Sequence, residues 1–243
     1  MVHLPPMLRW ALRGAAVLAA LAALAYGLDR GSRAAAETVV SRAIEHNDPA
    51  PQEAHVAIPG AFFLPDVVDG RYPHVQVRLD HISQEGLTVQ SVDADLYGVH
   101  LPLSLVVHQR VTAIPIDDSR ERALITYDAL NHYLAAQGRP ITVSNGTGGD
   151  LRLEAHLDTL GRSVSVSADA DMTPGVDYLD VTPTRLDTGS GVVDAASSVL
   201  LKVRLAFRVT TSPLPFGQQV QSIRATPAGV VVIATGHDVV IFP

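Results

Sequence analysis

Alternation of apolar and polar residues, repeated along most of the chain, is the feature that most constrains its fold. Val75, Val77 and Leu79 alternate with polar neighbours from His74 onward, as in a strand with one buried and one solvated face. The pattern returns at residues 87–89, 92–96, 99–107, 151–157 and 164–170, and closing strands are expected at residues 220–223, 229–235 and 238–242. So many amphipathic strands with few helices predict an α+β fold, in which a large curved antiparallel β-sheet is wrapped around one or more helices.

Two details of these strands can also be predicted. A bulge or turn is expected near Ser91, because residues 87–89 are out of phase with residues 92–96. Gly161-Arg162 is expected at the tip of a hairpin. The alternation over residues 99–107 predicts one long strand.

Three helices are expected among the strands. The first covers residues 32–46, with an apolar stripe that includes Val39 and Val40, and Asn47-Asp48-Pro49 stops it. The second includes Tyr127 and Leu134 and starts either near Ala123 or after Thr126 as its cap. The third has its apolar stripe at Val192, Ala196, Val199 and Val203.

The N-terminus has the pattern of an export signal. Arg9 and Arg13 precede an uncharged run, Gly14–Leu28, and this charge order leaves the N-terminus in the cytoplasm and the body outside it. The run is short for a membrane span, which needs roughly 17 to 25 residues, and Ala23-Leu24-Ala25 fits a cleavage site. Flanking arginines that can snorkel favour an uncleaved anchor instead. Residues 1–29 are therefore interpreted as a signal peptide or a membrane anchor, and residues 30–243 as one domain at the outer side of the cell membrane, or secreted to the envelope if the signal is cleaved.

Charge and cysteine content exclude several classes of function. The formal net charge is −7, whereas a face that binds nucleic acid normally shows a basic excess, so nucleic acid is not an expected partner. The chain contains no cysteine, which excludes disulfides, thiolate zinc sites and thiol catalysis.

Motifs for catalysis or for cofactor binding are not found in the sequence. It contains neither the G-x-S-x-G of serine hydrolases nor the H-E-x-x-H of zinc proteases. Asp93-x-Asp95 and Asp169-x-Asp171 could each hold a divalent cation, but the solvated face of an amphipathic strand is the favoured interpretation. We therefore expect no metal, no cofactor, no catalytic residues and no enzymatic activity.

A hydrophobic ligand is expected on the concave face of the curved sheet, where helices do not cover all the apolar side chains. Two apolar loops, Ala61–Leu64 and Leu214–Phe216, either touch a bilayer at the mouth of this site or cap the end of the core. The predicted lipid-binding residues are Phe62, Phe63, Leu64, Val77, Leu101, Leu103, Leu153, Val166, Leu214 and Phe216.

Several short motifs, taken in order, resemble those of one family. They are Ile58-Pro59-Gly60-Ala61-Phe62-Phe63-Leu64, Gly70-Arg71-Tyr72, Val75-Gln76-Val77, Leu96-Tyr97-Gly98-Val99, Leu214-Pro215-Phe216-Gly217, Ile223 and Pro227-Ala228-Gly229-Val230. Over about residues 30–242 the chain resembles the LmeA-like actinobacterial envelope proteins. The family pattern often has a Pro-Phe pair after the glycine, and Ala61-Phe62-Phe63 departs from it. The resemblance implies an elongated tubular lipid-binding fold, binding of phospholipids, particularly of the phosphatidylinositol type, and a role in envelope lipoglycan assembly.

Three hypotheses about function follow from the sequence. The preferred one is a lipid-binding or lipid-transfer module whose partners are phospholipid and the cytoplasmic membrane. A non-catalytic scaffold or accessory subunit of an envelope biosynthetic enzyme is the main alternative, and an unrecognised enzyme is the third. A ligand-sized apolar tunnel would favour the first, an exposed apolar patch over a filled core the second, and converging carboxylates the third.

Overall fold

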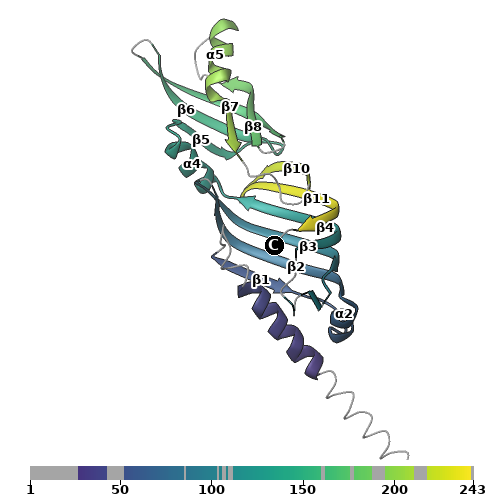
Figure 1. The fold of residues 1–243 in the computed structure, drawn as a ribbon. Helices are drawn as coiled ribbons and strands as arrows, with labels where there is room; N and C mark the ends of the chain where they lie inside the picture. The colour runs from purple at the N-terminus through teal and green to yellow at the C-terminus, as the bar shows by residue number, and fades with distance from the viewer. Residues whose placement is uncertain are drawn as a thin grey trace, which may run out of the picture.

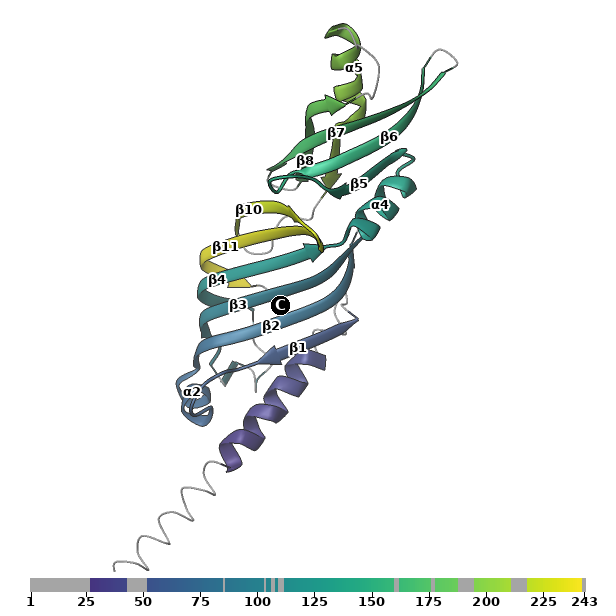
Figure 2. The same cartoon turned by 180° about the vertical axis from the view of Figure 1, so that it is seen from behind.

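Two antiparallel sheets make up most of the molecule. The computed structural model describes residues 27–42, 52–84, 86–102, 104–105, 108, 112–159, 162–175, 178–187, 195–210 and 218–241. Its first sheet has six strands in the order β1-β2-β3-β4-β11-β10, and its second has five in the order β5-β6-β7-β8-β9. Figures 1 and 2 show the two sheets following one another along an elongated body. The fold is antiparallel β with a few helices, as expected, but two sheets replace the single sheet.

The strands of the first sheet are β1 (Glu53–Ala57), β2 (Arg71–Gln84), β3 (Leu87–His100), β4 (Ile114–Ile125), β10 (Gln219–Thr226) and β11 (Gly229–Ile241). Those of the second are β5 (Ile141–Asn145), β6 (Leu151–Thr159), β7 (Arg162–Pro174), β8 (Tyr178–Asp187) and β9 (Phe207–Thr210). Helices α2 (Leu64–Asp69), α4 (Tyr127–Ala136) and α5 (Ala195–Leu205) accompany the sheets, and residues 27–42 form a further helix.

Thr126 divides the sheets. Its side chain accepts a hydrogen bond from the backbone N–H of Ala129 at 3.2 Å, which caps α4 and ends β4 one residue earlier. This is the second of the two expected starts for that helix. Asn131 then bonds both backbone groups of Val143, at 2.7 and 3.1 Å. The amide thereby fixes α4 to the edge strand of the second sheet.

The first sheet is curled into a half-barrel (Figure 2). In two of its strands, one residue with a left-handed backbone reverses the order in which side chains alternate between the two faces. Gly98 has φ 62° and Asp238 has φ 50°. Both lie at one level of the sheet, because their neighbours Val99 and Val239 each pair with Ile116. Val99, Ile116 and Val239 form a buried cluster against which Val75 and Leu96 pack. Val99, Ile116 and Val239 therefore lie on the same side of the sheet as Val75 and Leu96.

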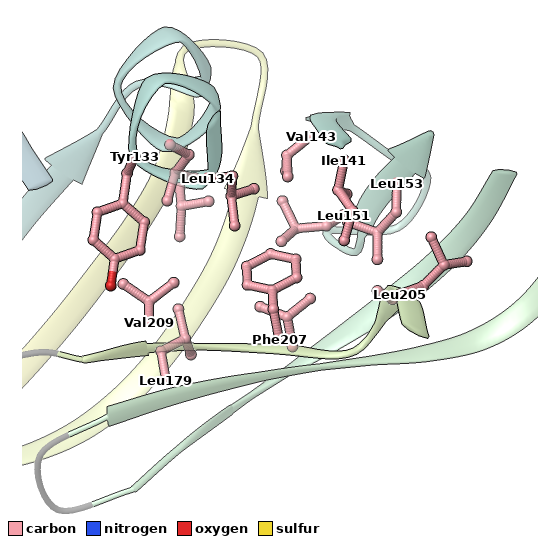
Figure 3. Close-up of a cluster of buried hydrophobic side chains, with 14 of the residues drawn as sticks. Tyr133, Leu134, Ile141, Val143, Leu151, Leu153, Leu179, Leu205, Phe207 and Val209 are labelled. Carbon is pink, nitrogen blue, oxygen red and sulfur yellow. The ribbon is translucent and has the colours of Figure 1, made fainter. Parts of the chain in front are cut away.

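The second sheet carries the close-packed core. Its inner positions include Leu153 and Ala168, each 0% exposed, and they pack against Leu134 of α4 and against residues from the end of the first sheet. Figure 3 shows the ring of Phe207 in the middle of this cluster, surrounded by leucine and valine side chains. The core thus joins the two sheets and α4 into one continuous body.

The helix over residues 27–42 packs through a polar stripe. Asp29, Arg33, Glu37 and Ser41 are spaced four residues apart, so they share one helical face. The carboxylate of Asp29 accepts hydrogen bonds from the N–H groups of Phe63 and Leu64 at 2.6 and 2.7 Å. Glu37 accepts one from Ile58, Ser41 accepts one from Val56, and Arg33 donates to the carbonyl of Gly60. The stripe therefore pairs with the backbone of β1 and of the loop after it.

The apolar stripe predicted for this helix does not pack against the body of the protein. Val39 and Val40 are exposed, because the polar stripe has taken the side that faces the body. The helix also begins earlier than the expected residue 32, and the expected boundary between residues 29 and 30 falls inside it. Residues 43–46 lie outside the described part of the chain.

Three other details of the prediction need correction. The expected strand 99–107 ends at His100, because the N–H of Leu101 bonds the carbonyl of Gly70 at 2.8 Å instead of a strand partner. Ser91 pairs regularly with Asp80. The irregularity expected near Ser91 lies on the neighbouring strand, at His81, whose φ is 54°. Helix α5 exists, but Val199 and Val203 of its expected stripe are exposed. The side chains of Val192 and Ala196 are not described. Of the expected hairpin tip Gly161-Arg162, Gly161 lies outside the described residues and Arg162 is the first residue of β7.

The predicted N-terminal signal peptide or membrane anchor, residues 1–29, lies almost entirely outside the described residues, which start at 27. Within the described ranges, no helix combines the length and the apolar character needed to cross a membrane.

Candidate lipid-binding site

One side of the first sheet is apolar across all six strands. Cross-strand partners in antiparallel sheets lie on the same face, so the pairing register defines it. We call it the apolar face; its aliphatic members are Ala54, Val56, Val75, Val77, Leu79, Val92, Ala94, Leu96, Ala123, Ile125, Val220, Ile223, Ala225, Val230, Val232 and Ala234.

The middle of the apolar face is only half buried. Val77, Val92 and Ala123 all retain partial exposure, whereas Leu153 and Val166, in equivalent positions of the second sheet, are 0% and 1% exposed. Aliphatic side chains left partly in contact with water across several strands mark a binding surface rather than a finished core. The apolar face therefore has room for an apolar ligand.

At one end this face continues into a cavity between the sheets. The cavity has a volume of about 70 Å³ and is lined by apolar residues of both sheets, among them Ile125, Ile223 and Val232 from the first and Phe207 and Val209 from the second. Pockets that enclose whole small molecules usually measure roughly 300 to 1,000 Å³. The cavity can hold only part of an acyl chain, so a lipid would lie mainly along the open apolar face.

Glu121 interrupts the apolar face on β4. Its carboxylate accepts a hydrogen bond from the side-chain amide of Gln218 at 2.7 Å, and the same amide donates to the Ser119 hydroxyl at 3.0 Å. Burial raises the pKa of Glu121, and the bond from Gln218 opposes that rise in part. A polar cluster of three residues is therefore set within aliphatic surroundings.

The opposite side of the sheet, the polar face, carries paired charges. Arg78 lies 3.6 Å from Asp93, and His74 lies 2.8 Å from Asp95. A hollow of about 480 Å³ on this side is lined by Tyr97, Asp118, Ser119, Arg120, Gln219, Thr235, Gly236 and His237. It is larger than the apolar cavity, but charged groups of both signs line it, which suits a solvated surface better than an acyl chain.

The structure does not bring the ten predicted lipid-binding residues together. Val77 lies on the apolar face, whereas Leu153 and Val166 lie in the core of the second sheet. Leu101 follows β3 beside Gly70. Leu103, Leu214 and Phe216 lie outside the described residues.

In the loop Ala61–Leu64, one residue caps the core and two residues remain exposed, where they could touch a bilayer. Phe62 is 61% exposed and Leu64 is exposed as well, whereas Phe63 is 4% exposed, with its ring 6.2 Å from that of Tyr72. Phe63 therefore caps the end of the fold, and its two neighbours present apolar side chains to the surroundings. A lipid-binding role for any of the ten residues stays a prediction.

Sequence reasoning missed Glu121, Gln218 and the small residues Ala94 and Ala234 beside them. One signal was available, because Glu121 falls in the apolar phase of β4, between Ser119 and Ala123. Gln218 gives no such signal, since its place depends on the long return of the chain to β10.

Among the described residues, Glu53, His55 and Asp80 form a group whose possible ligand atoms lie within 4.8 Å of one another. The group lies at the edge of the sheet on β1 and β2, and Glu53 and His55 are exposed. Such exposed groups are common without an ion. We draw no function from it.

Comparison with known families indicates the general function of the chain. A model of the LmeA-like phospholipid-binding family matches residues 27–235, which include both sheets up to the middle of β11. The chain belongs to this family. Neither a search of curated proteins nor a search of solved structures gave a match. The LmeA-like assignment indicates lipid binding in general, and the matched range contains the whole of the apolar face and its polar cluster.

Proposed function

We propose that this protein binds one phospholipid at a time, with its acyl chains along the apolar face of the first sheet. The observation that supports this is the partial exposure of Val77, Val92 and Ala123 on an otherwise aliphatic surface. Burying such side chains contributes roughly 25 cal/mol per Å² of apolar area removed from water. Acyl chains laid across the strands would gain this free energy without any change of fold.

A binding role explains the polar groups of the chain better than catalysis does. Three histidines each pair with an aspartate, at 2.8 Å for His74–Asp95, 2.9 Å for His100–Asp117 and 2.6 Å for His237–Asp118. A His–Asp pair becomes catalytic when the ring also activates a nucleophile. Among the described residues, none of these three rings is hydrogen-bonded to a serine or threonine hydroxyl. Paired charges of this kind stabilise the fold and its surface.

The cellular setting belongs to the same proposal. Arg9 and Arg13 before the apolar run Gly14–Leu28 support a body on the outer side of the cytoplasmic membrane. There the protein would bind phospholipid, including lipids of the phosphatidylinositol type, and support lipid transfer or lipoglycan assembly in the envelope.

A second role, as a non-catalytic scaffold or accessory subunit of an envelope biosynthetic enzyme, is favoured by one observation. Val199, Leu200 and Val203 of α5 are all more than 60% exposed, at the end of the molecule far from the N-terminal helix (Figure 1). Exposed aliphatic residues on one short helix suit contact with a protein partner. The two roles are compatible, because the patch lies on α5 beside β8 of the second sheet, whereas the apolar face belongs to the first sheet.

The decisive experiment is mass spectrometry of the lipids that copurify with the full chain. A stoichiometric phospholipid is expected. Ala123→Trp should displace it, because the indole ring would occupy the middle of the apolar face. The matched control is Arg122→Trp, whose side chain lies on the polar face one residue away in the same strand.

Two results would contradict the proposal. One is a wild-type chain that binds no phospholipid in this assay or after incubation with vesicles. The other is a loss of lipid in Arg122→Trp as complete as that in Ala123→Trp, which would place the ligand elsewhere. Thermal unfolding of both variants should be followed in parallel, so that a misfolded protein is not counted as a loss of binding.

A further inference from the structure

Glu121 lies between two small residues of the apolar face. Its direct partners across the strands are Ala94 on β3 and Ala234 on β11. The next strands outward place Val77 beside Ala94 and Val220 beside Ala234. Small side chains therefore flank the carboxyl group on both sides, and larger aliphatic residues lie one strand further out.

Gln218 adds a second buried hydrogen-bond acceptor beside Glu121. Its side-chain nitrogen donates to Glu121 and to Ser119, whereas its amide oxygen is buried and has no hydrogen-bond partner among the described residues. Gln218 as a whole is only 8% exposed. A buried acceptor without a partner is unfavourable, so it calls for an explanation, such as a hydrogen-bond donor on a bound ligand.

Gly236 shows that space for this arrangement is built into the fold. A Cβ added at Gly236 would come within 2.8 Å of the Ser119 hydroxyl oxygen and 2.9 Å of Gln218 Cγ. The absence of a side chain at Gly236 is what allows Gln218 to lie against β4 with its nitrogen toward Glu121.

We propose that Glu121 and Gln218 form a subsite that accepts hydrogen bonds from a donor group on the bound lipid. The donor is a hydroxyl group or a primary ammonium group. This inference rests on the proposed lipid binding and adds the chemistry that selects among lipids.

The chemistry of the two acceptors determines the kind of group that fits. The carboxylate of Glu121 and the amide oxygen of Gln218 both present lone pairs, so a phosphate group, which is itself an acceptor and an anion, would be repelled. The phosphate must therefore lie away from this subsite. A hydroxyl of glycerol or inositol and the ammonium of ethanolamine have the required donors, and choline has none.

Lipids that differ only in this donor provide the test. The full chain is incubated with mixed vesicles of phosphatidylethanolamine and phosphatidylcholine, and separately of phosphatidylglycerol and phosphatidylmethanol, all with the same acyl chains. Bound lipid is then quantified by mass spectrometry. We expect the donor-bearing lipid of at least one pair to be preferred roughly tenfold, as for a hydrogen bond to a charged group. Preference in the first pair identifies an ammonium and preference in the second a hydroxyl.

Variants then assign the preference to the subsite. Glu121→Leu should still bind lipid but lose the preference, and Gln218→Leu should reduce it, which provides a second test if the first variant does not fold. Glu154→Leu is the control, because Glu154 is an exposed acid on the second sheet. The proposal is overturned if the wild-type chain shows no preference in either pair, or if both folded variants keep it. A wild-type chain that binds none of the four lipids would contradict the proposed function itself.

Discussion

Asp29 accepts a hydrogen bond from the backbone N–H of Phe63 at 2.6 Å, across 34 positions of sequence. A second bond from Leu64 completes the pair, and Asp29 is 3% exposed. The carboxylate thus occupies the place of an N-terminal cap for α2, supplied by a different helix. Attachment of the N-terminal helix and formation of α2 are therefore coupled.

The first prediction concerns this attachment. Asp29→Asn should weaken attachment of the helix over residues 27–42, because a neutral amide oxygen accepts the two backbone bonds more weakly than a charged carboxylate, and its amide nitrogen would face the Arg33 guanidinium 3.6 Å away. Amide hydrogen exchange at Phe63 and Leu64 should become faster by at least roughly tenfold. Asp69→Asn, an exposed acid of α2, is the control and should leave exchange unchanged. Equal protection in wild type and Asp29→Asn would show that the helix is held by other contacts.

The same carboxylate gives a pH dependence with a definite sign. The hydrogen bonds from Leu64 and Phe63 and the nearby Arg33 lower the pKa of Asp29, and desolvation opposes this. A carboxyl group whose pKa is lower in the folded state stabilises the fold above its unfolded pKa of about 3.9. That stabilisation is lost as the pH falls through the lower, folded value. Helix attachment, followed by exchange at Leu64, should therefore weaken only below about pH 4.

A second prediction distinguishes core from binding surface. Leu153→Ala should destabilise the protein by about 2 to 5 kcal/mol, because it leaves a cavity in the close-packed second sheet. Glu154→Ala, exposed on the same strand, should stay within about 0.5 kcal/mol of wild type. Chemical denaturation provides the measurement. If Leu153→Ala costs less than about 1 kcal/mol, this position is not close packed and the predicted lipid contact there gains support.

A third prediction concerns His237. The hydrogen bond from its ring to Asp118, reinforced by the charges of Asp118, Asp238 and Asp117, raises its pKa. A raised histidine pKa means that the pair stabilises the fold below the unfolded pKa of about 6.5 and ceases to do so as the pH rises through the folded value. NMR titration of the ring should give a midpoint above 6.5 in the wild type and a lower one in Asp118→Asn. Identical midpoints would rule out the pairing.

A fourth prediction tests the reversal of alternation in the first sheet. Gly98→Ala should destabilise the protein by at least about 1 kcal/mol, because alanine is strained at positive φ. Its Cβ would also collide with the side chain of Asp117. Asp117→Ala combined with Gly98→Ala should recover the part of the loss that the collision causes. Urea unfolding of Gly98→Ala, Asp117→Ala and the double variant separates the two contributions, and an unchanged midpoint for Gly98→Ala would disprove the assigned backbone geometry.

Local patterns predicted much of the secondary structure. The alternation over residues 151–157 and 164–170 predicted the paired strands β6 and β7. Thr126 was recognisable as a cap because its hydroxyl satisfies an N–H within three residues. These features depend on neighbours in sequence, so a single chain contains enough information to find them.

The division into two sheets and the packing of the first helix depend on distant partners. The helix has an apolar and a polar stripe. The polar stripe packs against the body because Asp29 accepts hydrogen bonds from backbone N–H groups of the loop around Phe63. Asp238 is an ordinary L-residue, and nothing in its neighbours indicates its left-handed backbone. Period-two patterns also assign Val77 and Leu153 to the same kind of face, although they belong to different sheets.

The apolar face is continuous with the core, and this continuity links ligand binding to folding. Ile125 and Val230 are buried in the core. The half-buried Val232 lies on the same face, two residues beyond Val230 along β11. A lipid on that face would cover apolar side chains that the protein itself leaves partly exposed, and would so extend the core. The stability of the protein would then rise with the logarithm of free lipid concentration, and the delipidated form would be the one most exposed to proteases and to self-association.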